Sequence, residues 1–270
     1  MTAWEAFFSA LFSLLAVSGL GAVFGLLLSI ASRYLHVTRD KQLEEVEAAL
    51  PQLNCGACGY AGCAAYARAV KEADAAIDLC TPGGEETARK LASILGREMS
   101  YSQDRPVTQV HCRGGRGTAR YAFTYSGLRD CTALYLLGGG DKVCTYGCLG
   151  QGSCIKVCPV DCIAYDGQGL VWVDKERCIA CGKCIEVCPT KVMRFIPKSA
   201  DVIVACNSHD SGAATKNACT VGCTGCKLCE KRSPEGGFVV TDYLSTIDYQ
   251  AQGDRRPAEE KCPPRCIIPN

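Results

Sequence analysis

The sequence predicts an α+β protein: a single N-terminal transmembrane helix, a small α-rich domain, and two tandem modules of short strands and cysteine-rich loops. Three observations lead to this prediction. Residues 6–32 contain no charged side chain. Most of the 22 cysteines among the 270 residues stand in closely spaced groups, several of which end in Cys-Pro. Between two of these groups, residues 169–174 (GLVWVD) have the pattern of a short β-strand.

The uncharged segment is long enough to cross a membrane. As a helix, its 27 residues would measure about 40 Å, whereas the hydrocarbon core of a bilayer is roughly 30 Å thick. A cleaved signal peptide would have a basic start and a shorter apolar run, and a buried core helix would also be shorter. We therefore expect residues 1–33 to form a transmembrane anchor.

The charges that flank this segment predict its orientation. Only Glu5 precedes it, whereas Arg33, Arg39 and Lys41 follow it. By the positive-inside rule, everything after residue 33 lies in the cytoplasm, where thiols stay reduced and free to bind metal. The sequence thus predicts a single-pass protein of the cell (inner) membrane, with its cysteine-rich domains on the cytoplasmic side.

The most specific motif is a C-x2-C-x2-C-x3-C-P run that ends at Cys188-Pro189. This run is typical of bacterial ferredoxins, whose thiolates hold [4Fe–4S] clusters. A disulfide framework is typical of small secreted domains instead, and structural zinc sites use two separated cysteine pairs. We therefore expect iron–sulfur clusters that transfer electrons, held in modules with a bacterial-ferredoxin-like fold.

A second motif, NCGACGYAGC, begins at Asn54 in a predicted domain of residues 34–100. Its interleaved glycines permit positive φ angles and let backbone N–H groups approach a cluster closely. Residues 64–77 have helical composition, and a helix there could hold the next cysteine against the loop. A further helix is expected over residues 85–98. We assign one [4Fe–4S] cluster to Cys55, Cys58, Cys63 and Cys80.

Residues 101–139 are expected to connect this domain to a two-cluster module of residues 140–200. That module contains a wide group of cysteines followed by the regular run. In two-cluster ferredoxins, the fourth cysteine of each run ligates the other cluster. The predicted ligand sets are therefore Cys144, Cys148, Cys154 with Cys188, and Cys178, Cys181, Cys184 with Cys158.

The last module, residues 201–270, is expected to be a degenerate copy with one cluster. Its cysteine run lacks the fourth member, because Ser233 stands before Pro234, and a lone Cys262-Pro263 follows. Crossed ligation explains this pattern, since the ligands kept all belong to one cluster: Cys223, Cys226, Cys229 and Cys262. The ligands lost all belong to the other: Ser233, Gln252, Arg255 and Ala258.

These assignments use sixteen cysteines in four clusters and leave six others. Cys162 and Cys266 each follow a Cys-Pro cysteine by four residues and are expected to pack in the core. The remaining four are either buried free thiols or the ligands of a fifth cluster: Cys112, Cys131, Cys206 and Cys219. We expect no catalytic residue, since neither a Ser-His-Asp set nor paired carboxylates stand out. A net charge of +1 gives no reason to expect nucleic-acid binding.

In its membrane segment, its CGACGYAGC-x16-C motif and its later cysteine runs, the chain resembles RnfB, the iron–sulfur protein of the Rnf complexes. The segment from HCRGG to CTYGCLGQGSCIKVCP is similar to the clostridial type. The resemblance implies a subunit of an ion-translocating ferredoxin:NAD oxidoreductase that exchanges electrons with soluble ferredoxin. It also implies partner membrane subunits that carry flavin and translocate ions, and a separate subunit that handles nicotinamide.

Two other functions stay open on the sequence alone. The chain could be an electron-transfer subunit of another membrane oxidoreductase, such as a hydrogenase or a quinone reductase. It could also be an iron–sulfur redox sensor, although no output domain is visible beside the cysteine runs.

Overall fold

A computed structural model describes residues 3–34, 40–99 and 105–270 of the chain. The chain divides into two compact units, Met1–Glu45 and Val46–Asn270.

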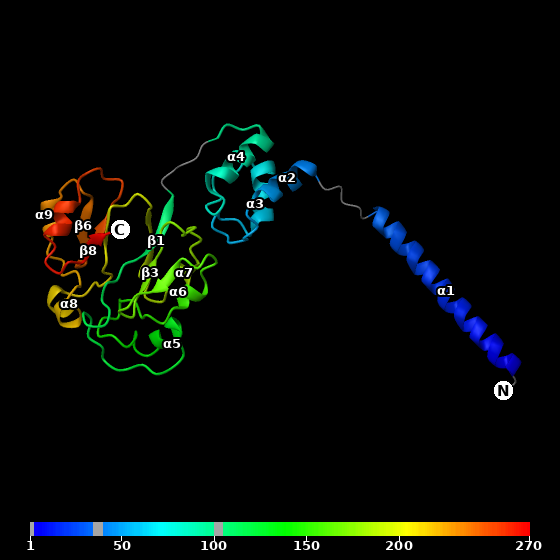
Figure 1. Cartoon of the computed structure of the whole chain (residues 1–270), viewed down its shortest axis with the longest axis horizontal. Helices are drawn as coiled ribbons and strands as arrows, with labels where there is room; N and C mark the ends of the chain where they lie inside the picture. Colours follow the sequence, from blue (N-terminus) through cyan, green and yellow to red (C-terminus); the bar gives the residue numbers. More distant parts are fainter. Residues whose placement is uncertain (1–2, 35–39, 100–104) are drawn as a thin grey trace. The chain divides into compact units, whose positions relative to one another are not determined.

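The first unit consists mainly of one long helix, α1 (Ala3–Tyr34; blue in Figure 1). Within the described residues, its segment Leu14–Tyr34 is long and apolar enough to cross a membrane. Large apolar side chains such as Phe12, Val17 and Leu28 are exposed along the helix, as expected for a surface that faces lipid. Arg33 stands in the last turn of α1, whereas Arg39, which also entered the orientation argument, lies outside the described residues.

Helices predominate in residues 46–99, as the sequence predicted. α2 (Lys41–Ala49) is followed by α3 (Cys63–Glu72) and α4 (Gly84–Leu95), each with buried apolar residues. Val46, Tyr66 and Leu91 are almost completely buried. α4 ends at Gly96, whose positive φ angle of 63° closes the helix, and Arg97 then donates hydrogen bonds to the carbonyls of Val70 and Ala75. These bonds connect the end of α4 to the end of α3.

Residues 105–200 contain two antiparallel strand pairs, one enclosed by the other in the sequence. β1 (Pro106–Val110) pairs with β4 (Met193–Pro197), and between them β2 (Ile163–Tyr165) pairs with β3 (Val171–Val173). The predicted strand at 169–174 is thus β3. β1 lies within the segment expected to be a connection, yet it supplies the partner strand of β4. Three short helices complete this part: α5 (Cys131–Tyr135), α6 (Ser153–Lys156) and α7 (Lys183–Glu186).

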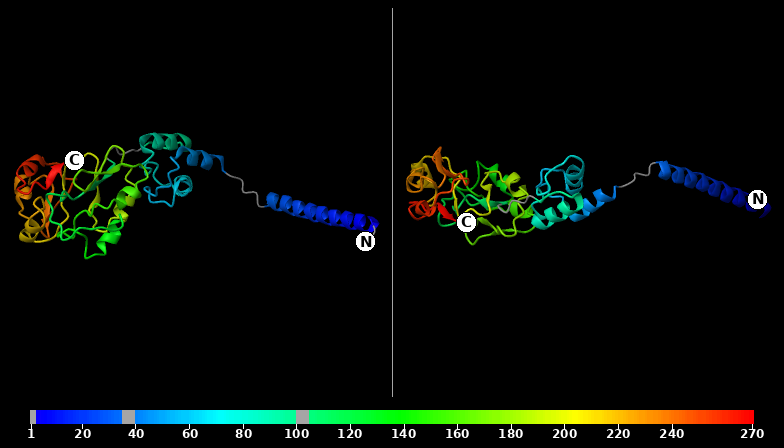
Figure 2. Two further views of the ribbon diagram at one scale, coloured as in Figure 1. Left: turned by 60° about the horizontal axis from the view of Figure 1, so that its bottom comes forward. Right: turned by 90° about the horizontal axis from the view of Figure 1, so that it is seen from above.

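Residues 201–270 repeat the same order of strand pairs. β5 (Val202–Val204) pairs with β8 (Ile267–Pro269), and between them β6 (Phe238–Thr241) pairs with β7 (Leu244–Ile247). The chain therefore ends beside the strand that opens this segment, within the yellow-to-red region of Figure 2. The helices of this part are α8 (Gly212–Ala218), α9 (Leu228–Arg232) and α10 (Arg256–Glu260).

The apolar cores of these two segments are small and contain many cysteines. One buried cluster joins Val107, Val171 and Met193 to several thiols, and the other joins Val202, Phe238 and Leu244 to several more. Sheets of two strands bury little surface alone, so a module of this size usually needs an added centre for stability. The thiols in these cores are placed to bind one.

We predict that removing residues 1–34 will move the protein from the membrane fraction to the soluble fraction. The apolar side chains of α1 are the part of the described chain that gains most from burial in lipid. Fractionation after a carbonate wash measures this, with the full chain as the control. A truncated chain that stays in the washed membranes would contradict the prediction.

Candidate metal centres

In the described part of the chain, five cavities are each lined by at least four cysteines. Their volumes are about 290, 310, 310, 320 and 420 Å³. The cysteines that meet in each cavity correspond closely, but not completely, to the sets expected from the sequence.

The cavity of the α-rich domain is lined by all four cysteines expected there: Cys55, Cys58, Cys63 and Cys80. Gly56 and Gly62 have φ angles of 77° and 117°, which an L side chain rarely adopts. The Asn54 carboxamide oxygen accepts a hydrogen bond from the backbone N–H of Cys63 at 2.8 Å and so holds the loop against the start of α3. Burial raises the pKa of Cys80 to about 11.

A second cavity brings Cys158 together with the first three cysteines of the regular run: Cys178, Cys181 and Cys184. This is the crossed set that the sequence predicted. Positive φ angles at Ala180 (53°) and Gly182 (78°) curl the loop around the cavity. The backbone N–H of Thr108, on β1, donates to the Cys178 sulfur at 3.5 Å, so the outer strand contributes directly to this site.

A third cavity differs from the predicted set in one member. It is lined by Cys148, Cys154 and Cys188, as expected, but its fourth cysteine is Cys131 and not Cys144. Counting back from Cys-Pro explains why. In the regular run the ligands stand four, seven and ten residues before Cys188. The same positions before Cys158 are Cys154, Gln151 and Cys148. The middle ligand is therefore absent from this run, and a cysteine from another segment takes its place.

Local hydrogen bonds hold Cys131 against this run. Asp130 caps α5, because its carboxylate accepts from the backbone N–H of Ala133 at 2.9 Å. The Ser153 hydroxyl donates to the same carboxylate at 3.0 Å and accepts from the backbone N–H of Cys131 at 2.8 Å. Ser153 immediately precedes Cys154, so these contacts place two cysteines from distant segments side by side.

The C-terminal cavity contains the four cysteines that the sequence assigned to the surviving cluster: Cys223, Cys226, Cys229 and Cys262. Its loop repeats the backbone of the regular run. Gly225 and Lys227 have φ angles of 65° and 59°, at the same spacing from Cys223 as Ala180 and Gly182 from Cys178. The two unassigned thiols also match, since Cys162 lies 3.5 Å from the Cys158 sulfur and Cys266 lies 3.6 Å from the Cys262 sulfur.

Three of the four positions that the sequence predicts to be lost ligands lie in the interior. Ser233, Arg255 and Ala258 are buried, whereas Gln252 is exposed. The Arg255 guanidinium donates to the Gly236 carbonyl at 2.8 Å, the Ala251 carbonyl at 2.7 Å and the Asp201 carboxylate at 3.1 Å. It also lies 5.4 Å from the centre of the Tyr249 ring. These contacts hold the Arg255 side chain in the core.

The fifth cavity contains Cys144 together with three of the four cysteines that the sequence left unassigned: Cys112, Cys206 and Cys219. Cys131, the other member of that leftover set, lies in the third cavity instead. The structure thus exchanges Cys131 and Cys144 between the two predicted sets. The spacing of cysteines before Cys158-Pro159 is the sequence signal that places Cys144 outside the set of the third cavity.

The thiols in these cavities suit an iron–sulfur cluster, because at least four cysteines line each space and thiolates are the usual ligands of such clusters. Burial raises the pKa of Cys148 and of Cys154 to about 12, so their thiolates need a positively charged partner such as iron.

We predict that Cys131→Ala will remove one cluster, that is, about four irons per chain. Gln151→Ala is the matched control, because Gln151 occupies the position of the missing ligand and should leave the iron content unchanged. Iron and acid-labile sulfide in the purified chain measure both effects. An unchanged iron content in Cys131→Ala would return Cys144 to this ligand set.

We predict that Arg255→Met will lower the free energy of unfolding of the C-terminal segment by roughly 2 to 4 kcal/mol, because buried hydrogen-bond acceptors lose their donor. Arg256→Met, at the exposed neighbouring position, is the control and should change little. Urea unfolding followed by circular dichroism measures the difference. Equal midpoints for the two variants would show that the guanidinium does not stabilise the core.

Comparisons with known protein families agree with two of these sites. A family model for an Fe-S cluster matches residues 50–82, which include the whole cysteine set of the α-rich domain. A model for a 4Fe-4S binding domain matches residues 171–194, which include the regular run. The chain therefore contains iron–sulfur binding domains.

Similar proteins extend over most of the chain. It is 39% identical to the B subunit of the ion-translocating oxidoreductase complex of Methanosarcina acetivorans, over 88% of this chain and 90% of that protein. It is 39% identical to the B subunit of the Na(+)-translocating ferredoxin:NAD(+) oxidoreductase complex of Acetobacterium woodii, over 92% and 74%. The proton-translocating ferredoxin:NAD(+) oxidoreductase complex of Clostridium ljungdahlii has a B subunit that is 37% identical, over 94% and 90%. These identities confirm the resemblance inferred from the motifs, and the chain belongs to the family of B subunits of Rnf-type ion-translocating oxidoreductase complexes.

Proposed function

We propose that this chain exchanges electrons with soluble ferredoxin and relays them to the membrane subunits of an Rnf-type ion-translocating ferredoxin:NAD oxidoreductase. The observation that carries the proposal is a series of four-cysteine cavities in a chain that also has a membrane-length helix. Two relatives that match over most of this chain are subunits of complexes named for this reaction.

Four [4Fe–4S] clusters fit four of the five cavities. The proposed ligand sets are Cys55, Cys58, Cys63, Cys80; Cys131, Cys148, Cys154, Cys188; Cys158, Cys178, Cys181, Cys184; and Cys223, Cys226, Cys229, Cys262. Such clusters take up and release single electrons at potentials that depend on hydrogen bonds and burial. The protein's contribution is therefore to fix the thiols, direct N–H groups at sulfur and exclude water.

The repeated strand order supports two tandem ferredoxin-like modules. In each, an outer strand pair encloses a hairpin, and the loop of the cysteine run has positive φ angles at the same two positions. The first module then begins at β1 and not at residue 140, because β1 is the partner of β4. The second module keeps one of its two sites and fills the other with Arg255.

The remaining parts of the reaction belong to other subunits in this proposal. The sequence has no Gly-rich nucleotide loop, which agrees with a separate subunit for nicotinamide and with flavin carried by membrane subunits. Arg33 at the end of α1 favours an orientation with residues 46–270 in the cytoplasm. Two relatives of nearly equal identity belong to complexes that translocate different ions, so we place the choice of ion outside this chain.

We further propose that the two C-terminal modules accept electrons and that the α-rich domain, nearest the anchor in the sequence, delivers them. Cys58→Ala should then preserve ferredoxin-dependent reduction of the other clusters while stopping turnover of the assembled complex. Ala57→Ser, in the same loop, keeps all four thiols and should turn over normally. Visible spectroscopy with reduced ferredoxin and an assay of ferredoxin-dependent NAD reduction separate the two steps. Normal turnover of Cys58→Ala would refute this order.

A further inference from the structure

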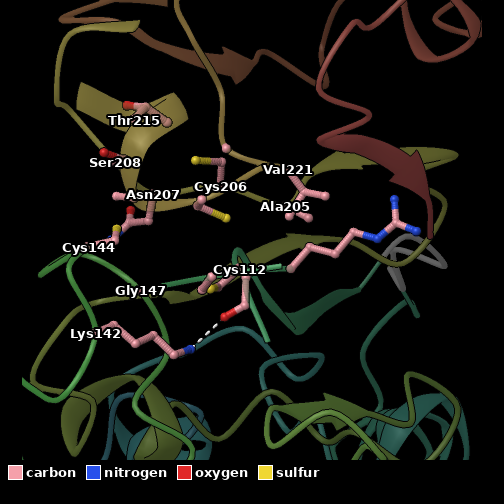
Figure 3. A pocket seen from close by; sticks show the side chains of 16 residues that line it. Cys112, Lys142, Cys144, Gly147, Ala205, Cys206, Asn207, Ser208, Thr215 and Val221 are labelled. Atoms are coloured by element: carbon pink, nitrogen blue, oxygen red, sulfur yellow. Dashed lines mark hydrogen bonds between the residues drawn. The ribbon is translucent and has the colours of Figure 1, made fainter. Parts of the chain in front are cut away.

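The fifth cavity has the features of a site that the four proposed clusters do not use. Its volume is about 420 Å³, and its four cysteines come from four separate segments of the chain. Cys112 follows β1, Cys144 precedes the first cysteine run, Cys206 follows β5, and Cys219 ends α8. Figure 3 shows Cys112, Cys144 and Cys206 on different walls of this cavity.

Glycines let the backbone lie close to the sulfurs in this cavity. A Cβ atom on Gly114 would stand 3.0 Å from the Cys219 sulfur and 3.9 Å from the Cys112 sulfur. A Cβ atom on Gly147 would stand 3.6 Å from the Cys112 sulfur. Two sulfurs therefore lie beside one glycine, so the backbone can approach a centre held between them.

A backbone amide is directed at a third sulfur. The N–H of Cys223 donates to the Cys206 sulfur at 3.2 Å. A donated hydrogen bond stabilises a thiolate more than a thiol. Cys206 is buried, and it lines this cavity together with the other three cysteines.

A buried lysine in the wall of the cavity donates its hydrogen bonds to backbone carbonyls. Lys142 is only 4% exposed, and its ammonium group donates to the carbonyls of Gly114 and Cys148, both at 2.6 Å. It also lies 5.6 Å from the centre of the Tyr121 ring. Among the residues that the structure describes, no ion pair joins Lys142 to a carboxylate, and the Asp141 carboxyl beside it in the chain acts on it only at longer range. A buried ammonium without a close counter-ion is costly, so this cavity suits an anionic group.

We propose that Cys112, Cys144, Cys206 and Cys219 hold a fifth [4Fe–4S] cluster, whose negative charge Lys142 compensates. The contacts of this site connect it to two others. Lys142 binds the carbonyl of Cys148 from the third cavity, and Cys206 accepts from the N–H of Cys223 in the C-terminal cavity. The fifth cluster would therefore bridge the two ferredoxin-like modules. This proposal rests on the proposed function only where it makes the fifth cluster a member of the relay. The binding of metal can be measured without electron transfer.

The test is the metal content of the full chain, purified without oxygen. Five clusters give about twenty irons per chain, whereas four give about sixteen. Cys219→Ala should lose about four irons and an equal amount of acid-labile sulfide. The Cys131→Ala, Cys219→Ala double variant should lose about eight, because the two cysteines belong to different sites. Thr220→Ala, at the exposed position next to Cys219, is the control and should lose none.

Three results would overturn the proposal. One is sixteen irons in the unmodified chain, which decides the matter even if a variant fails to fold. Another is an iron content that Cys219→Ala leaves unchanged. The third is one zinc per chain that disappears in Cys219→Ala, because the site would then be a structural zinc centre. A loss of four irons supports the site even if the chain fails to exchange electrons with ferredoxin, so the two proposals are tested separately.

Lys142→Met tests the charge compensation by a redox titration followed by EPR. A cation stabilises the reduced, more negative state, so its removal should shift to a more negative potential the cluster signal that Cys219→Ala abolishes. Lys90→Met, at an exposed lysine of α4, should shift none. If no signal moves in Lys142→Met, the lysine does not serve a redox centre and this part of the proposal fails.

Discussion

The structure depends on thiols that meet in small cavities where an ordinary protein of this size would have a larger apolar core. Residues 105–200 and residues 201–270 each have two sheets of two strands and a core in which cysteine is a major component. Two-stranded sheets are marginal in water, and burial holds thiols such as Cys148 in their protonated form. A cluster that draws off these protons would bind the walls of a cavity together, so folding and metal loading are coupled.

Much of this arrangement follows from sequence spacing, because ligand geometry is local. The regular run that ends at Cys188 and the motif around Cys55 each confine three thiols to one loop, so their assignment needed no tertiary information. The crossed membership of Cys158 was predicted from the ligation pattern of two-cluster ferredoxins. Likewise, the uncharged residues 6–32 predicted α1, since the length needed to span a bilayer is a property of a single segment.

Contacts between distant segments were less visible in the sequence. Cys131 enters the third cavity through Asp130 and Ser153, which lie 23 residues apart and form no recognisable motif. The fifth cavity draws on four segments between Cys112 and Cys219, and no local spacing connects them. β1 was missed for the same reason, because a five-residue strand gains its stability from β4, far along the chain. Contacts between distant segments depend on the complete fold. Here the one local sign of such a contact was Gln151, which stands where the cysteine run would have its middle ligand.

Crossed membership of the cysteines also has a consequence for how the protein matures in the cell. The cavity that contains Cys131 is incomplete until the ribosome has added Cys188, and the cavity that contains Cys112 is incomplete until it has added Cys219. An early thiol must therefore wait unpaired while a long stretch of chain is translated. Neither cavity can therefore receive a complete set of ligands until most of the chain has been made.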